Sequence, residues 1–365
     1  MKVPFSDLKL RHAKNFDKFQ VAFIDSLRTN EFILGKKVKE FESNFSRFVN
    51  AKFAVGVANG SDALRIALTI KDLPQKGEVL LAPNTYFAAA AAIIHSGLIP
   101  RFFDVELSSR FPTESSISRS HNSDTVAIIR SHLFGEADIA SSGGLLEIHD
   151  CSQAHGTMIN DSHVGKGSLS TFSLYPGKNL GALGDGGVIT TDSQEEYENV
   201  LAWRNQGTRT DKYLHEVVGF NSRLDSIQAA ILSVKLQNLV AENQRRQRIA
   251  QIYRTNLESA KDVIGLFSTP NHVFSTNHLY QVYLRFSDIT KVQGTLEKVG
   301  VETGRHYPIP LHLQPALRYL GYSKGDFPNV EDLADKTLSL PNYPEMTDQQ
   351  VDYVSEALIE AVAQE

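Results

Sequence analysis

Between residues 53 and 150, short and almost continuously apolar segments alternate with segments of helical pattern. The apolar segments are FAVGVA (53–58), VLLAP (79–83), IPRFFDV (99–105), TVAIIRSHLFG (125–135) and LLEIHD (145–150). Strands that are apolar on both faces are typical of a mostly parallel sheet covered by helices on both sides. The alternation therefore predicts an α/β fold. At most one helical turn fits between the last two segments, so one crossover should be unusually short.

The remaining pattern predicts two domains. RLDSIQAAILSVKLQNL (223–239) has the periodicity of a long helix, and the composition changes after it. Beyond this point the segments QVYLRF (281–286) and VETGRHY (301–307), with helices near 290–299, 330–339 and 347–363, are expected to make a separate α+β unit. The sequence thus predicts a large domain over residues 1–240, including N-terminal helices, and a smaller C-terminal α+β domain over 241–365. In the N-terminal helices, the shared face of Phe16, Phe19, Phe23 and Leu27 is expected to be core.

Composition excludes several classes of function. The net charge is −5 and no cluster of Lys or Arg stands out, which argues against nucleic-acid binding. Cys151 is the only cysteine, so neither an intrachain disulfide nor a cysteine-built metal site is expected, and we predict no metal. The longest apolar run, AAAAAIIHSGLIP (88–100), is too short to span a bilayer, and the N-terminus is too polar for a signal peptide. We therefore expect a cytoplasmic protein without a membrane segment.

One lysine occupies a distinctive place. In LSTFSLYPGKNLGALGDGG (169–187), an apolar run of strand character stops at Pro176, and Lys178 follows at the start of a glycine-rich loop. A lysine held at a strand end can lose water, which lowers its pKa and frees the amine to form a Schiff base. The alternative is an ordinary surface lysine after a turn.

Three other segments are expected at the same edge of the sheet, because ligands of such sheets bind at the carboxyl ends of the strands. The small-residue turn Ala58–Asp62 opens a helix and suits a phosphate, although many such turns only cap helices. Tyr86 follows a strand and could stack on a flat cofactor or simply pack in the core. Asp150 ends a strand, and the protonated ring nitrogen of pyridoxal phosphate would be a natural partner for its carboxylate. Ser173 could donate to the phosphate.

With these residues in view, the sequence resembles a known family, the pyridoxal phosphate-dependent sugar aminotransferases of the DegT/DnrJ/EryC1/StrS type. The resemblance runs nearly end to end, and the segments that carry it are FILG (32–35), GVANGSDAL (56–64), SHLFGEAD (131–138), DCSQAHG (150–156), FSLYPGKNLGALGDGG (172–187), NSRLDSIQAA (221–230) and HYPIPLHLQPA (306–316). It implies the fold-type-I aminotransferase architecture, with pyridoxal 5′-phosphate as cofactor and a nucleotide-linked keto sugar as substrate.

The resemblance also implies roles for individual residues. Lys178 would carry the Schiff base and shuttle the proton, and Asp150 would pair with the pyridinium nitrogen. Tyr86 would stack on the ring, and Gln153 would lie against its opposite face or near the phenolic oxygen. Gly60, Ser61 and Ser173 would hold the phosphate, which Asn221 would reach from the partner subunit. This last contact implies a homodimer. Residues near the sugar substrate would be Tyr175, His306, Tyr307 and, more loosely aligned, Lys212 from the neighbour.

NSRLD followed by HYPIP is similar to the branch that aminates C3 of dTDP-3-keto-6-deoxyhexoses, with L-glutamate as the expected donor. The alternatives are a C4 aminotransferase for a 4-keto nucleotide sugar, and a non-catalytic sensor of nucleotide sugars. A dehydratase-type relative would have histidine in place of Lys178, and a Rossmann oxidoreductase would show an early G-x-G-x-x-G. Three features depart from the family pattern: Glu136, His149 and the short segment 136–146. Glu136 or His149 could tune the cofactor environment.

Overall fold

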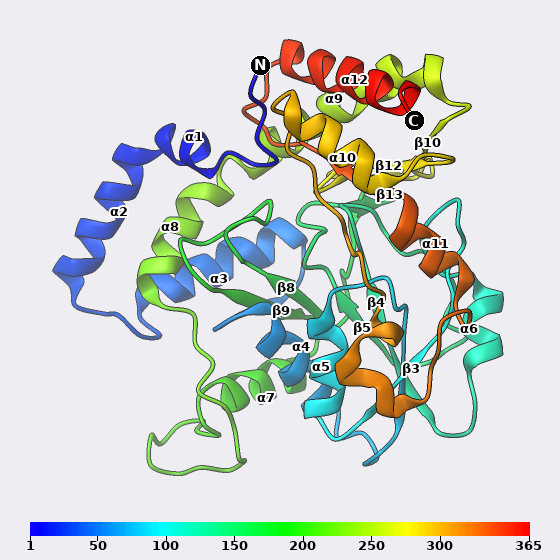
Figure 1. The fold of residues 1–365 in the computed structure, drawn as a ribbon. Helices are drawn as coiled ribbons and strands as arrows, with labels where there is room; N and C mark the ends of the chain where they lie inside the picture. Colours follow the sequence, from blue (N-terminus) through cyan, green and yellow to red (C-terminus); the bar gives the residue numbers. More distant parts are fainter.

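A seven-stranded sheet forms the centre of the larger part of the molecule in the computed structural model, which describes residues 1–365 (Figure 1). The strand order is β1-β9-β8-β5-β4-β2-β3. The strands are β1 (Phe53–Val57), β2 (Glu78–Leu81), β3 (Ile99–Phe102), β4 (Thr125–Ser131), β5 (Glu147–Asp150), β8 (Ser170–Ser173) and β9 (Gly187–Thr191). Only β9 runs antiparallel to its neighbours β1 and β8, and all other pairs are parallel. The predicted mostly parallel α/β sheet is confirmed.

Helices cover both faces of this sheet, as the apolar character of its strands requires. The covering helices are α3 (Lys36–Val49), α4 (Gly60–Thr69), α5 (Phe87–His95), α7 (Gln194–Arg204) and α8 (Ser226–Leu236). Along β1, Ala54 packs into the core with α3 and α8, whereas Val55 and Val57 pack into the opposite core with α4 and α5. A further helix, α6 (Glu114–Ser120), lies between β3 and β4 in sequence.

No helix lies between β4 and β5, so the expected short crossover is confirmed. The chain over residues 132–146 is held instead by ion pairs of Arg130, whose side chain is buried. Its guanidinium donates to both carboxylate oxygens of Asp138, at 2.7 and 2.8 Å, and pairs with Glu147 at 3.1 Å. A bidentate pair of this kind fixes the orientation of the segment that leads from β4 back to β5.

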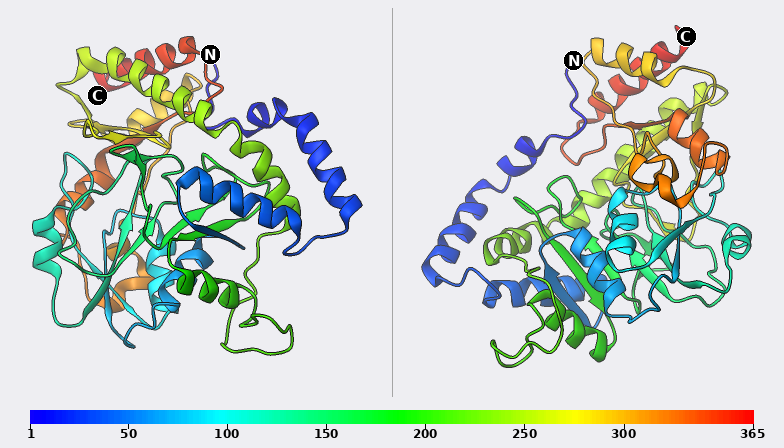
Figure 2. Two further views of the ribbon diagram at one scale, coloured as in Figure 1. Left: turned by 180° about the vertical axis from the view of Figure 1, so that it is seen from behind. Right: turned by 60° about the horizontal axis from the view of Figure 1, so that its bottom comes forward.

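The smaller part of the molecule contains an antiparallel sheet of β10 (Ile264–Leu266), β12 (Tyr280–Leu284) and β13 (Thr337–Leu340). It is covered by α9 (Leu239–Leu257), α10 (Ile289–Lys298) and α12 (Asp348–Ala363), with a separate apolar core (Figure 2). The helix expected over 330–339 ends at Lys336, because the next four buried residues pair with β12 as a strand. A third, small sheet joins β6 (Met158–Ile159), β7 (Ser162–His163) and β11 (Val273–Phe274).

The C-terminal segment does not stay within one core. Its short helices η2 (Leu311–Leu313), η3 (Pro315–Leu320) and α11 (Pro328–Lys336) contribute buried side chains to the core of the larger sheet. The remaining helix between β10 and α9 is η1 (Glu258–Ala260). A domain boundary near residue 240 stays a prediction, since α9 runs without a break from the larger part into the smaller one.

The N-terminal helices α1 (Leu8–Ala13) and α2 (Phe16–Thr29) lie along the outside of the molecule in every view (Figures 1 and 2). The expected core face of α2 is wrong for the single chain. Phe19 is buried, but Phe16, Phe23 and Leu27 are 57, 44 and 48% exposed. The physical reason is that α2 packs mainly against α8, which covers only one edge of its apolar face. No helix of the chain combines the length and apolar character needed to cross a bilayer.

Candidate active site

The strand ends named from the sequence meet at one edge of the sheet. Strands β1, β2, β5 and β8 all run in the same direction, so the residues that follow them gather there. Gly60, which opens α4 after β1, lies directly against Ser173 at the end of β8: a Cβ added at Gly60 would be 2.6 Å from the Ser173 Cβ. Only glycine allows these two segments to come this close.

The Gly60–Ser173 contact forms a cradle that fits a phosphate. Gly60 and Ser61 are the first two residues of a ten-residue helix, whose earliest N–H groups have no partner within the helix. Asn59 already caps the helix by accepting from the Asp62 N–H at 2.8 Å. The N–H groups before Asp62 and the Ser173 hydroxyl therefore remain available to an anion, which the helix dipole also favours.

The charges of Lys178 and Asp150 interact at this edge of the sheet. Burial lowers the pKa of the Lys178 amine to about 8, and the attraction of Asp150 opposes this only in part. Burial likewise raises the pKa of the Asp150 carboxyl, although Ser152 and Lys178 pull it down. The Ser152 N–H donates to Asp150 at 3.1 Å. An electron-poor ring with an aldehyde and a protonated nitrogen would satisfy both groups, so the donor set fits pyridoxal phosphate.

Tyr86, Gln153 and Tyr307 form one wall of the site. The rings of Tyr86 and Tyr307 lie 5.7 Å apart at their centroids, and the Gln153 amide donates to the Tyr307 hydroxyl at 2.9 Å. The Gln153 carbonyl oxygen in turn accepts from the Phe134 N–H at 2.7 Å, which fixes the orientation of the amide. The Tyr86 ring is 60% exposed, so it has a free face. Tyr86 would therefore be able to stack on the ring of the cofactor.

His306 lies next to this wall. Burial and the charge of Lys178 lower the pKa of its imidazole to about 4. Its Nδ1 is 2.9 Å from the Ser339 hydroxyl, and its ring packs edge-on against Tyr307. A histidine that stays neutral here can exchange hydrogen bonds with sugar hydroxyls without adding charge. Tyr175, another expected sugar contact, is exposed beside the same site, with its N–H donating to the Ser173 hydroxyl at 3.3 Å.

Two expected residues are not brought to the site of their own chain. Lys212 and Asn221 lie in the loop between α7 and α8, which projects from the larger part of the molecule (Figure 1). Lys212 is exposed and lies over the ring of Tyr213, and Asn221 is exposed and bridges to Asn205. Their expected roles require a second subunit and stay predictions.

Two of the three departures from the family pattern, Glu136 and His149, form no hydrogen bond or ion pair with Lys178 or Asp150. Glu136 pairs with Arg110 at 2.8 Å. His149 contacts His132 at 2.9 Å and Glu147 at 3.1 Å. Since successive residues of a strand point to opposite faces, His149 and Asp150 are on different sides of the sheet. An influence of Glu136 or His149 on the cofactor environment stays a prediction, and for Glu136 it would act through Arg110.

Sequence reasoning missed Arg11, whose side chain forms hydrogen bonds to the backbone of the loop that contains Lys178. Its guanidinium is 6% exposed, donates to the Lys178 carbonyl at 3.1 Å and to the Asn179 carbonyl, and pairs with Glu242 at 2.6 Å. Lys235 of α8 adds a hydrogen bond of 2.6 Å to the Gly181 carbonyl. In the sequence Arg11 is only one basic residue of an N-terminal helix, 167 positions away, so no local signal points to it.

Replacing Arg11 by methionine is expected to loosen this loop. Hydrogen bonds to charged groups contribute roughly 1.5–3 kcal/mol, and the change also leaves Glu242 without its cation. Deuterium exchange should become faster at the amides of Lys178 and Ala182, which bond within the loop to Tyr175 and Leu174. Arg28→Met, in an exposed position of α2, is the matched control and should leave that exchange unchanged. Equal exchange in both variants would show that Arg11 does not hold the loop.

The lowered pKa of Lys178 predicts a pH dependence that exposed lysines do not share. Below a pKa of about 8 the neutral amine gains tenfold per pH unit, and above it the gain stops. In the apoenzyme, labelling of Lys178 by an amine-reactive reagent should therefore level off near pH 8. Labelling of a free lysine amine, whose pKa is about 10.4, should keep rising toward pH 10, and peptide mapping identifies the Lys178 product. A Lys178 profile that also rises to pH 10 would contradict the desolvated amine.

Comparison with known proteins gives a consistent result over almost the whole chain. The model of the DegT/DnrJ/EryC1/StrS aminotransferase family matches residues 15–359. A protein of Geobacillus stearothermophilus described as a pleiotropic regulatory protein is 37% identical, over 99% of this chain and 98% of its own. The dTDP-3-amino-3,6-dideoxy-alpha-D-galactopyranose transaminase of Aneurinibacillus thermoaerophilus is 36% identical, over 98% of both chains. The structure of DesV from S. venezuelae in complex with a ketimine intermediate superposes with a TM-score of 0.95 at 33% identity, covering 99% of this chain and 98% of DesV.

Proposed function

Since the chain belongs to the DegT/DnrJ/EryC1/StrS aminotransferase family, we propose that it transfers an amino group from L-glutamate to C3 of a dTDP-3-keto-6-deoxyhexose. At the coarser level the protein is a pyridoxal phosphate-dependent sugar-nucleotide aminotransferase of fold type I. The observation that carries this chemistry is a lysine of lowered pKa that interacts electrostatically with a half-buried carboxylate at the strand ends, beside the Gly60–Ser173 cradle.

Pyridoxal phosphate, when bound, supplies an electron-accepting ring that stabilises negative charge on the carbon next to the transferred nitrogen. The residues of the chain do the rest. The neutral Lys178 amine accepts the proton from the donor's Cα and returns it, and its fixed position replaces an encounter in solution. Asp150 would hold a positively charged ring nitrogen. Gly60, Ser61 and Ser173 would hold the phosphate, and Tyr86 would cover the ring.

Two lines of support favour C3 and a deoxyhexose. The relative from Aneurinibacillus is named for a 3-amino-3,6-dideoxy sugar linked to dTDP. In this chain, His306 and Tyr307 stand beside the cofactor wall as neutral hydrogen-bonding groups, which suit sugar hydroxyls rather than an added acidic group. The nature of the amino donor rests on the resemblance, and L-glutamate is proposed on that basis.

We also propose a homodimer in which Asn221 reaches the partner's phosphate site. Large apolar side chains are exposed on α2, and others follow on the loop that contains Asn221. They are Phe16, Phe23, Ile24 and Leu27 on α2, and Tyr213, Leu214 and Val218 on the loop. Exposed apolar surface of this extent marks a protein interface. Sedimentation of the purified protein should give a dimer, and Asn221→Ala should weaken cofactor binding without changing the oligomeric state.

The test runs the proposed reaction in reverse, with the amino sugar as the amino donor and 2-oxoglutarate as the acceptor. The protein loaded with pyridoxal phosphate is mixed with 2-oxoglutarate and with dTDP-3-amino-3,6-dideoxyhexose, its 4-amino isomer or the corresponding UDP sugars. Formation of glutamate from the 3-amino dTDP sugar alone is the expected result. Turnover of the 4-amino isomer instead would reject C3 and leave an aminotransferase acting at C4. Absence of any glutamate, with the visible absorbance of the bound cofactor unchanged by L-glutamate, would reject both donor and substrate.

A further inference from the structure

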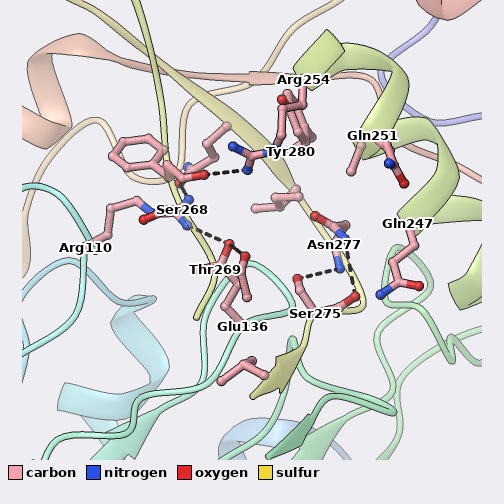
Figure 3. A pocket seen from close by; sticks show the side chains of 15 residues that line it. Arg110, Glu136, Gln247, Gln251, Arg254, Ser268, Thr269, Ser275, Asn277 and Tyr280 are labelled. Atoms are coloured by element: carbon pink, nitrogen blue, oxygen red, sulfur yellow. Dashed lines mark hydrogen bonds and ion pairs between the residues drawn. The ribbon is translucent and has the colours of Figure 1, made fainter. Parts of the chain in front are cut away.

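A second pocket lies between the two parts of the molecule, apart from the cofactor site. Its volume is about 360 Å³, within the range of small-molecule sites. Helix α9 lines one side with Gln247 and Gln251, and Arg110 lies on the opposite side (Figure 3). None of Lys178, Asp150 or Tyr86 lines it. The pocket is therefore a separate cavity, whose lining the transamination chemistry leaves unexplained.

The pocket carries one positive charge in excess. Arg110 is 3% exposed, lies over the ring of Phe267 at 4.0 Å, and pairs with Glu136 at 2.8 Å. A buried guanidinium needs such a carboxylate, so these two charges cancel. Arg254, at an exposed position of α9, also lines the pocket and has no carboxylate partner; its guanidinium donates to the Phe267 carbonyl at 2.7 Å and leaves other N–H groups free. A planar guanidinium with free N–H groups is suited to a phosphate or carboxylate.

The rest of the lining is rich in hydroxyls and amides. Gln247, Gln251, Ser268, Thr269, Ser275 and Asn277 all contribute to it. Each of these side chains can both donate and accept, which matches a ligand with several hydroxyl groups better than an apolar one. The Arg110 Nη2 adds a buried nitrogen whose only partner is the Glu136 charge, without a hydrogen bond of good geometry.

We propose that this pocket binds a small anionic carbohydrate, with its phosphate or carboxylate on Arg254 and its hydroxyls on the amide and hydroxyl groups of the lining. The inference goes beyond the proposed reaction, because it concerns a different cavity and does not depend on which keto sugar is aminated. It also gives a role to Glu136, the acidic residue that departs from the family pattern: by neutralising Arg110 it leaves a site for one anionic group rather than two.

The pocket is physically connected to the cofactor site. Arg110 donates to Gln281 at 2.9 Å, and the Gln281 amide donates to the carbonyl of His306 at 3.3 Å. The neighbouring Tyr307 accepts from Gln153 at 2.9 Å. Arg110 also lies 4.6 Å over the ring of Phe134, whose N–H donates to Gln153. Both routes end on the amide that borders the cofactor, so a ligand that shifts Arg110 would act on that wall.

The experiment is calorimetry with the pyridoxal phosphate-loaded full chain, using glucose 1-phosphate, glucuronate, glucose and inorganic phosphate as probes. Glucose 1-phosphate or glucuronate should bind, and glucose should not. Arg254→Gln should weaken that binding about tenfold or more, since it removes a charge-assisted contact. Arg248→Gln is the matched control: Arg248 is an exposed arginine of the same helix, but it does not line the pocket and pairs with Asp348. It should leave the binding unchanged.

The outcomes separate this site from the active site. Neither Arg254 nor Arg248 belongs to the cofactor site, so both variants should keep the visible absorbance of the cofactor and its response to L-glutamate. Glucose 1-phosphate binding that survives Arg254→Gln would place the probe in the substrate site and overturn the proposal. Inorganic phosphate binding as tightly as glucose 1-phosphate would reduce it to an adventitious ion only. Absence of binding to the wild type would also overturn it, whatever the result of the transamination assay.

The connection to the cofactor site has its own readout. Because coupling between two sites is reciprocal, glucose 1-phosphate should change the dissociation constant for pyridoxal phosphate about fivefold or more in the wild-type apoenzyme. The same addition should have no effect on Arg254→Gln. An unchanged dissociation constant in the wild type would overturn the connection through Arg110.

Discussion

Lys178→Ala is expected to reduce transamination by at least about 10⁴-fold, because it removes both the nucleophile and the group that moves the proton. Burial lowers the pKa of this amine, so the charged amine reduces the stability of the folded chain. Removal of the amine should therefore leave the melting temperature unchanged or slightly raised. The measurement is single-turnover consumption of L-glutamate, with cofactor binding followed by fluorescence because the visible band of the lysine-bound cofactor will be lost.

Two comparisons make the Lys178 experiment decisive. Lys166→Ala removes an exposed lysine of the same sheet region and should keep full activity. Added methylamine should restore part of the proton transfer to Lys178→Ala, since a small amine can enter the space left by the side chain. Full activity of Lys178→Ala would reject the assignment of this residue. Loss of activity together with loss of the folded state would be visible in the melting temperature.

Asp150→Asn is expected to lower the rate about 10²–10³-fold while the cofactor stays bound, because the amide keeps the shape but not the charge. The raised pKa of the Asp150 carboxyl arises mainly from burial, and a bound positive ring nitrogen would lower it again. The loss should appear in the rate of the glutamate half-reaction more than in the affinity for pyridoxal phosphate. Asp150→Glu should recover little, because the carboxylate would move by one methylene.

The matched control is Asp161→Asn, at an exposed position of the turn between β6 and β7. It should leave the half-reaction unchanged. If Asp150→Asn instead kept the wild-type rate and only weakened cofactor binding, Asp150 would be a binding residue without electronic effect on the ring. A pH profile separates the two: the wild-type carboxylate titrates, whereas the amide of the variant does not.

The sequence was informative where a pattern is local. Apolar runs bounded by glycine and proline located the strands β1 to β5, and the lack of room before Leu145 predicted the crossover without a helix. The strand ends also placed Asp150, Ser173 and Gly60 at one edge, since parallel strands must deliver their carboxyl ends together. The close contact of Gly60 with Ser173 is the physical reason that this position has no side chain.

The sequence was uninformative where the burial of a side chain, or the end of a helix, depends on contacts with other segments. The face of Phe16, Phe23 and Leu27 on α2 has the periodicity of a core helix, yet the chain alone leaves it exposed. Periodicity shows only that a face is apolar and not which surface covers it. In the same way, the helix expected through residue 339 ends earlier, because β12 offers hydrogen-bond partners to Thr337–Leu340.

The fold class and the family could be read from the sequence, because these depend on residue types at fixed spacing along strands and loops. Only the tertiary structure decided how those residues are held. Arg11 reaches the Lys178 loop from 167 positions away, and Arg110 and Glu136 meet in an interdomain pocket instead of at the cofactor. Contacts between distant segments follow from packing and burial of charge, and a linear pattern contains no record of them.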